Sequence, residues 1–234
     1  MNIFQRQELL LGREAQEKLA GSHVAVCGLG GVGSFLCEAL VRSGVGELTL
    51  IDSDTVADSN INRQLYALHS TVGRFKTEVA SKRIADINPN ARLHLLRDYI
   101  TPDNAAYLVR DCGFICDAID YVPGKIALIE YAWHTKVPLI SAMGAGRRLD
   151  PSRLRIADIS STGNCPLARS IRRQLRQRGI NEGVTVCCSS ETPVRQLESP
   201  DTIGSVAFVP SVMGLMMAGY VIRTITGISD QSVQ

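Results

Sequence analysis

The feature that most constrains the fold is a run of glycines placed between an apolar strand and an amphipathic helix. The apolar run at 24–27 predicts a buried strand, and a glycine-rich turn follows it at 28–33. Apolar residues then recur at helical spacing over 32–42, and a second apolar strand is expected at 48–51. A strand, a helix and a strand of this length form a right-handed crossover, whose parallel strands are covered on both faces. The sequence therefore predicts an α/β fold.

The alternation of helices and strands continues to about residue 146. Helices are expected at 75–87 and 126–133, and strands at 92–96, 115–119 and 137–141. Beyond this point we expect a strand at 154–159, an arginine-rich helix at 167–178, a strand at 184–188, a polar loop at 189–201 and a last helix. The whole pattern is typical of a Rossmann-like, mostly parallel sheet with helices on both faces and a C-terminal elaboration.

Composition excludes several classes of protein. Of the 234 residues, 45% are hydrophobic and 21% are charged, which rules out disorder, collagen and coiled coil. Charged residues interrupt the first twenty positions, so no secretory signal is visible and we expect a cytoplasmic protein whose seven cysteines are reduced thiols. The stretch 202–222 carries no charge, but Pro210 and three glycines interrupt it. We therefore predict a buried helix there and no stable membrane insertion.

The glycine turn indicates a nucleotide. Gly28, Gly30, Gly31 and Gly33 let the backbone approach a phosphate, and the amides at the start of the following helix face it. Asp52 follows the next strand at about the spacing of an acid that binds a ribose hydroxyl. This much is compatible both with NAD used for hydride transfer and with ATP used for adenylation.

Polar residues after the second strand favour a triphosphate. Asn60, Arg63 and Gln64 lie just past that strand, and Lys76 begins the next helix. Arg63 and Lys76 can neutralise the β- and γ-phosphates, although each taken singly is more often a solvated surface charge. No P-loop sequence occurs, so we expect attack at the α-phosphate.

A carboxylate near the end of a later strand is the expected metal ligand. Asp120 lies where open parallel sheets bind ligands, and Mg²⁺ is commonly held by one or two carboxylates together with phosphates. Asp117 lies within the expected strand, and a role at the strand edge or as a helix cap is the alternative for it. ATP and Mg²⁺ are thus the expected cofactors.

We expect one domain over residues 1–234. Residues 1–146 would form the nucleotide-binding core and 147–234 the elaboration, because about 85 residues with a long polar loop bury too little apolar surface to fold alone. That loop, at 189–201, is long for a connection and contains two prolines. We interpret it as a lid over the bound nucleotide.

These motifs together resemble the ThiF and MoeB adenylyltransferases of the ubiquitin-activating enzyme superfamily. The resemblance rests on elements at 6–7, 28–33, 51–54, 59–64, 73–76 and 117–120, which agree in order over most of residues 5–145 and include Asp54. It implies that Asp52, Asn60, Arg63, Lys76 and Asp120 form the nucleotide site. It also implies that Arg6 reaches in from the other subunit of a homodimer.

Cysteine positions indicate the branch. The sulfur-carrier activators have two CxxC pairs that bind zinc, and no two cysteines here are three residues apart. The acceptor cysteine of relatives would fall near 203–206, where none occurs. Cys165 begins a helix and could have a lowered pKa, but a bystander role is the favoured interpretation.

The later sequence is similar to the branch that dehydrates threonylcarbamoyladenosine in tRNA, through the segments 142–147, 165–168 and 204–214. The resemblance implies that ATP adenylates the carboxylate of the modified base, whose own atoms then close a ring. It also associates the branch with sulfur-mobilising proteins of cysteine desulfurase systems. Two alternatives stay open: activation of the C-terminal glycine of a sulfur-carrier or ubiquitin-like protein, and a nucleotide-binding module or NAD enzyme.

The arginine-rich helix is the candidate tRNA surface. Arg169, Arg172, Arg173 and Arg176 have the spacing i, i+3, i+4 and i+7, which places them on one face of a helix. Like charges so arranged repel one another unless an anion covers them, and phosphates of tRNA would do so. An ordinary solvated face is the alternative.

Overall fold

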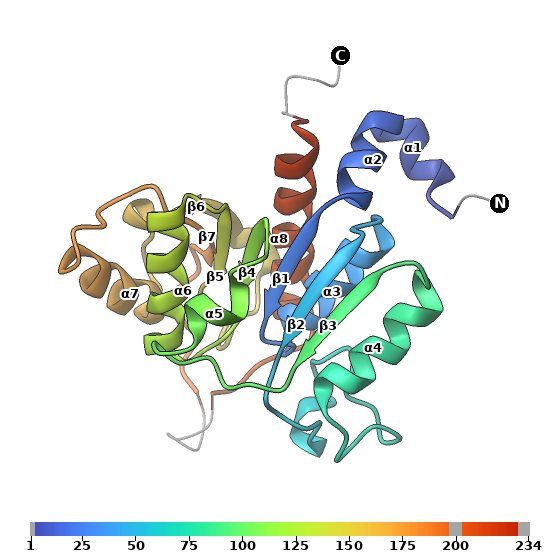
Figure 1. Ribbon diagram of the computed structural model, residues 1–234. Coiled ribbons are helices and arrows are strands. Elements are labelled where there is room, and N and C mark those ends of the chain that lie inside the picture. Colours follow the sequence, from blue (N-terminus) through green and yellow to red (C-terminus); the bar gives the residue numbers. More distant parts are fainter. Residues whose placement is uncertain (1–2, 197–202, 229–234) are drawn as a thin grey trace.

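The computed structural model describes residues 3–196 and 203–228, which form one seven-stranded sheet (Figure 1). The strand order is β3-β2-β1-β4-β5-β7-β6, and all neighbours are parallel except β6, which runs antiparallel to β7. The strands are β1 (His23–Cys27), β2 (Glu47–Ile51), β3 (Arg92–Leu96), β4 (Phe114–Asp117), β5 (Leu139–Ala142), β6 (Leu154–Asp158) and β7 (Thr185–Ser189). The predicted α/β class and mostly parallel sheet are confirmed.

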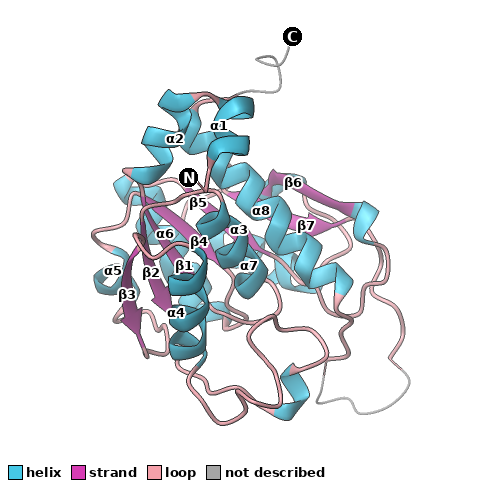
Figure 2. Ribbon diagram, turned by 90° about the vertical axis from the view of Figure 1, so that its right-hand side faces the viewer, coloured by secondary structure: helices cyan, strands magenta, loops and turns pink. Residues whose placement is uncertain are grey.

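Helices cover both faces of the sheet (Figures 1 and 2). Alternate residues of β1 point to opposite faces, so Val24 and Val26 pack with α3, α4 and α8, whereas Ala25 and Cys27 pack with α5 and α6. The helices are α1 (Gln5–Leu11), α2 (Arg13–Ala20), α3 (Gly33–Arg42), α4 (Lys76–Ile87), α5 (Ala105–Val109), α6 (Val122–Thr135), α7 (Pro166–Arg176) and α8 (Phe208–Thr226). Three short 3₁₀ turns are η1 (Asp58–Asn60), η2 (Pro151–Arg153) and η3 (Ile159–Ser161).

The residues after 146 join this core. Strands β7 and β6 extend the sheet beyond β5, and α8 packs across α3 at Gly214, where a Cβ would overlap the carbonyl oxygen of Val32. By length and composition α8 is long and apolar enough to cross a membrane. Its side chains Val209, Met213, Met217 and Val221 are nonetheless fully buried in the main core, as expected for the predicted core helix. The division at residue 146 stays a prediction.

Several element boundaries differ from the predicted ones for local reasons. Strand β4 ends at Asp117 and not at 119, because the Asp117 side chain accepts the amide of Ile119 at 3.2 Å and turns the chain away. Strand β5 begins at Leu139 and not at 137, because Pro138 has no amide to donate to the sheet. Helix α7 ends at Arg176, since Gly179 adopts a left-handed conformation just beyond it.

The polar loop predicted at 189–201 begins one residue later, because Ser189 belongs to β7. Its described part is tied to the segment after β5: the Glu191 carboxylate accepts the amides of Leu149 and Asp150, each at 3.1 Å. Residues 197–201 lie outside the described residues. The lid therefore stays a prediction.

Candidate active site

The glycine turn lies between β1 and β4, where the chain switches from one side of the sheet to the other. Gly28 has a φ of +88°, and a Cβ there would lie 2.9 Å from the carbonyl oxygen of Ala118. A Cβ on Gly33 would overlap the carbonyl oxygen of Gly28. The turn can be this tight only because both residues lack a side chain. The carboxyl edge of such a switch point is where open α/β sheets bind nucleotides.

Gly30 and Gly31 are partly exposed and face the polar segment predicted to bind phosphate. A Cβ on Gly31 would lie 3.5 Å from Cγ of Arg63, and one on Gly30 would lie 3.9 Å from Nε2 of Gln64. The structure therefore brings the 59–64 segment against the glycine turn. The start of α8 closes the other side, because Pro210 Cβ is 3.2 Å from the same position on Gly31.

Asp52, Asp54 and Lys76 form an ion-paired group beside the turn. Lys76 is only 5% exposed, and its Nζ lies 2.6 Å from Asp54 Oδ2 and 3.7 Å from Asp52 Oδ1. Asp52 accepts the backbone amide of Leu29 at 2.7 Å, which ties the end of β2 to the glycine turn. Burial raises the pKa of Asp52, although Lys76 and the amide of Leu29 oppose the shift. A nearly buried ammonium at this edge is suited to a polyphosphate.

Arg63 and Asn60 are held by their own loop. The Arg63 guanidinium donates to the carbonyl of Ser59 and to Oδ1 of Asn62, both at 2.8 Å. Asn60 Oδ1 accepts the amide of Ala57 at 3.2 Å. These contacts orient the Arg63 side chain next to Gly31 before any ligand arrives.

Asp120 is exposed, three residues beyond the end of β4. Desolvation and the charge of Asp120 raise the pKa of Tyr99, whose ring centroid is 5.1 Å from that of Tyr121. An exposed carboxylate at the carboxyl edge of the sheet is the kind of oxygen ligand that Mg²⁺ takes alongside phosphates.

Arg6 does not lie at this edge of its own chain. It is exposed on α1, where Gln7 donates to the carbonyl of Ser43 at 2.6 Å. Ser43 caps the C-terminal end of α3, whereas the glycine turn precedes its N-terminal end. A ten-residue helix is about 15 Å long, so the two ends are far apart. The structure does not bring Arg6 together with the other predicted residues.

Sequence reasoning missed a buried polar group beside the glycine turn. Lys125 and Asp117 are both fully buried, with Nζ 2.8 Å from Oδ2. Ser141 donates to the same oxygen at 2.6 Å, and Lys125 also donates to the carbonyl of Ala142 at 3.0 Å. This group links the carboxyl ends of β4 and β5 to α6. The sequence did hold a signal for this pair: Lys125 follows Asp117 by eight residues and lies among the apolar residues of α6.

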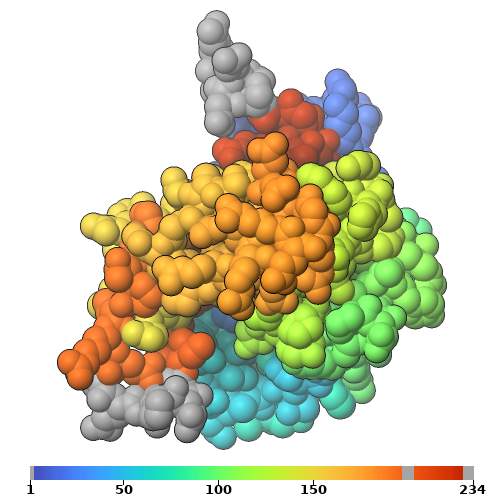
Figure 3. All heavy atoms as spheres, turned by 90° about the vertical axis from the view of Figure 1, so that its left-hand side faces the viewer, coloured from blue at the N-terminus to red at the C-terminus, as the bar shows by residue number. Residues whose placement is uncertain are grey.

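The four arginines of α7 do not form one free face. Arg169, Arg173 and Arg176 are exposed. Figure 3 presents the face of the molecule that α6 and α7 share. Arg172 is half-buried instead, and its guanidinium donates to the carbonyl of Thr162 at 2.8 Å. Arg172 therefore differs from the three exposed arginines, and its contact fixes the turn before the helix.

All seven cysteines are buried and free. Burial raises the pKa of Cys37 and that of Cys187 to about 12. Cys165 is 3% exposed, and its Sγ accepts the amide of Ala168 at the start of α7. This burial agrees with the expectation of reduced thiols.

The chain is similar to known proteins over most of its length. A model of the ThiF family matches residues 4–234. The tRNA threonylcarbamoyladenosine dehydratase of Bacillus subtilis is 43% identical over 240 residues, which cover 95% of this chain and 94% of that protein. Crystal structures of Escherichia coli tRNA N6-threonylcarbamoyladenosine dehydratase in complex with AMP and with ATP are both 36% identical, with TM-scores of 0.90 and 0.89. They cover 96% of this chain, and it covers 94% and 93% of theirs. The chain belongs to the ThiF family.

Proposed function

We propose that this protein uses ATP to dehydrate threonylcarbamoyladenosine in tRNA. The observation that carries the proposal is similarity over 95% of the chain to a tRNA threonylcarbamoyladenosine dehydratase. The site agrees with it chemically, because a glycine turn, Arg63 and Lys76 suit a nucleoside triphosphate. The buried cysteines offer no exposed thiol to accept an acyl group.

The reaction has two steps. A carboxylate oxygen of the threonylcarbamoyl group attacks the α-phosphorus of ATP. The bond from the α-phosphorus to the oxygen that bridges the α- and β-phosphates breaks, which releases pyrophosphate. The carbamoyl group of the same modification then attacks the activated carbonyl, and AMP leaves with the oxygen that came from the carboxylate. The base loses one water in total, and the enzyme supplies no nucleophile.

Each residue of the site has a role in the first step. The glycine turn and the first amides of α3 would hold the phosphates, and Asp52 would bind the ribose. Arg63 and Lys76 would stabilise the charge that develops on pyrophosphate. Asn60 stabilises the loop that carries Arg63 by accepting the amide of Ala57, and Gln64 lies next to Gly30 of the turn.

Mg²⁺ fits the exposed carboxylate of Asp120, and it would shield the negative charge of the polyphosphate when bound. A calorimetric titration of ATP with and without Mg²⁺ tests this role. Asp120→Asn should weaken Mg²⁺-dependent ATP binding and leave the fold intact, because Asp120 is exposed.

A homodimer accounts for Arg6. Because α1 lies at the opposite end of α3 from the glycine turn, Arg6 can act only at the site of a second copy. Mixing Arg6→Ala with Lys76→Ala tests this arrangement, since a mixed dimer then has one intact site and regains activity. No regain of activity in a verified mixed dimer would contradict the shared site.

The exposed arginines of α7 are the proposed tRNA contact. Arg169, Arg173 and Arg176 would pair with backbone phosphates without reading sequence. Replacing each by alanine should weaken tRNA binding and flatten its dependence on salt, whereas Arg172→Ala should mainly destabilise the turn at Thr162. A sulfur-mobilising protein of a cysteine desulfurase system is a second proposed partner, to be tested by copurification.

The deciding experiment is to incubate the purified protein with ATP, Mg²⁺ and tRNA that carries threonylcarbamoyladenosine, and to weigh the digested nucleosides by mass spectrometry. We expect ATP-dependent loss of one water from that nucleoside. Lys76→Ala should lower the rate about a hundredfold, and Lys82→Ala on the exposed side of α4 is the matched control. ATP binding without any mass change would move the assignment to activation of a carrier protein.

A further inference from the structure

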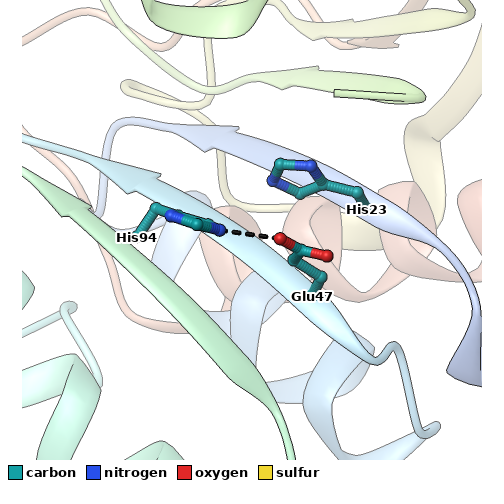
Figure 4. A group of neighbouring side chains, drawn as sticks. All are labelled: His23, Glu47 and His94. Carbon is teal, nitrogen blue, oxygen red and sulfur yellow. Dashed lines mark hydrogen bonds and ion pairs between the residues drawn. The ribbon is translucent and has the colours of Figure 1, made fainter. Parts of the chain in front are cut away.

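A second group of chemically competent side chains lies at the other end of the sheet. His23 and Glu47 are the first residues of β1 and β2, and His94 lies on β3 (Figure 4). The strand register pairs His23 with Glu47, and pairs Thr49 with His94. Because residues two apart on a strand point to the same face, the three side chains share one face of the sheet.

The three side chains converge on one small volume. Their candidate ligand atoms all lie within 4.8 Å of one another. His94 Nε2 is 2.7 Å from Glu47 Oε1, and the two imidazole rings are 5.3 Å apart between centroids. Hydrogen-bonded neighbouring strands hold the three backbones, so little conformational entropy has to be lost for all three to reach one ion.

We propose that His23, Glu47 and His94 form a binding site for a divalent transition metal, Zn²⁺ in the first instance. Two imidazoles and one carboxylate are a known zinc ligand set, which leaves one position open. Imidazole nitrogen favours zinc, copper, nickel and iron over magnesium and calcium. The site is therefore chemically distinct from Asp120, the proposed Mg²⁺ ligand at the opposite edge.

A fourth ligand is close by. Cys112 follows α5, and its Sγ lies 3.6 Å from Nε2 of His23. Cys112 is only 5% exposed. A bound metal ion would stabilise the thiolate and could add Cys112 as a fourth ligand.

The alternative to a metal site is an ordinary surface ion pair, and the two interpretations differ in which contacts of Glu47 they use. Arg92 binds Glu47 Oε2 at 2.6 Å, which leaves Oε1 for His94. An ion pair between Glu47 and Arg92 and a hydrogen bond between Glu47 and His94 do not require His23, which bonds Thr49 at 2.8 Å. Metal binding would exchange the hydrogen bonds of His23 and His94 for coordinate bonds and leave Arg92 in place.

Calorimetry on the untagged full-length protein tests the site. The protein is first freed of metal with a chelator and then titrated with Zn²⁺ without nucleotide. We expect one tight equivalent, and Glu47→Gln and His94→Asn should each weaken it at least about tenfold, since even the loss of groups behind the ligands costs that much. His134→Asn, which removes an exposed histidine on α6, is the matched control and should leave binding unchanged. Equal binding in His94→Asn and His134→Asn, or no saturable binding, would overturn the proposal.

Cobalt supplies an independent readout. Co²⁺ in a four-coordinate site of this kind gives visible d–d absorption, and a thiolate ligand adds a charge-transfer band in the near ultraviolet. We expect both in the wild type, and Cys112→Ser should lose the second and keep the first. Absence of visible absorption with bound Co²⁺ would overturn the four-coordinate site, and a charge-transfer band that persists in Cys112→Ser would remove Cys112 from it.

Discussion

The packing of α8 on α3 can be tested with two glycines of the same helix. A Cβ on Gly214 would overlap the carbonyl oxygen of Val32 and lie 2.9 Å from the amide nitrogen of Leu36. A Cβ on Gly219 would meet nothing within 4 Å. The substitutions Gly214→Ala and Gly219→Ala therefore add the same methyl group to the same helix in opposite surroundings.

Their effects on stability should have opposite signs. Alanine favours a helix over glycine by about 1 kcal/mol, so Gly219→Ala should stabilise the protein by about that amount. Gly214→Ala gains the same helix propensity, but its added methyl group meets backbone atoms, which cannot rotate away as a side chain would. Overpacking costs about 1–3 kcal/mol, and taking the upper value leaves a net loss of about 2 kcal/mol. For a chain of this size, 1 kcal/mol shifts Tm by about 2–4 °C.

Differential scanning calorimetry and ATP titration are the assays. Gly219→Ala should raise Tm by about 2–4 °C, and Gly214→Ala should lower it by about 4–8 °C. Because Pro210 of α8 flanks Gly31, displacement of α8 by Gly214→Ala should also weaken ATP binding. If both variants raise Tm, the close contact between α8 and α3 does not exist in solution.

Three further predictions concern charged side chains. Lys76→Met should lower dehydration turnover about a hundredfold, measured by single-turnover kinetics, and an unchanged rate would remove Lys76 from the site. Lys125→Met leaves the carboxylate of Asp117 buried without a positive partner, so the free energy of unfolding in urea should fall by about 3–5 kcal/mol. A fall of under about 1 kcal/mol, which is typical of losing an exposed ion pair, would contradict the burial of this pair. Burial alone would raise the pKa of Glu38, but its pairing with Arg83 and Arg42 lowers the pKa below the ordinary value of 4.5. The pairing therefore stabilises the fold at pH values above 4.5, and this stabilisation is lost as the pH falls through the lowered pKa. Glu38→Gln should remove this part of the acid sensitivity in thermal melts between about pH 3 and 6, and an unaltered pH profile would contradict the pairing.

Most of the central sheet could be predicted from local pattern. The first four strands and the helices α3 and α4 lie within a residue or two of their expected positions. For β1, β2 and β4 the reason is that parallel strands buried on both faces are nearly continuous apolar runs. The helices α1, α2 and α5 were not predicted. Helix α1 has no buried residue among its seven and α5 is only five residues long, so neither carries a strong periodic signal.

The site residues divide in the same way. Gly28 and Gly33 could be identified from spacing, because the steric demand of the turn is local. The engagement of Arg172 with Thr162 could not, since helical spacing places a side chain on a face but does not say what the preceding turn offers it. The pairing of Lys125 with Asp117 likewise needed the position of α6 over β4.

The sequence by itself determined the succession of the seven strands and the longer helices, the glycine turn and the nucleotide as the kind of ligand that the turn accepts, because these depend on residues close together in the chain. Only the tertiary structure decided that β6 and β7 extend the sheet, that α8 closes one side of the glycine turn and that Arg6 lies away from its own site. It also decided that His23, Glu47 and His94 meet. Those contacts join residues far apart in sequence, and their geometry follows from strand register and helix packing, which no local pattern encodes.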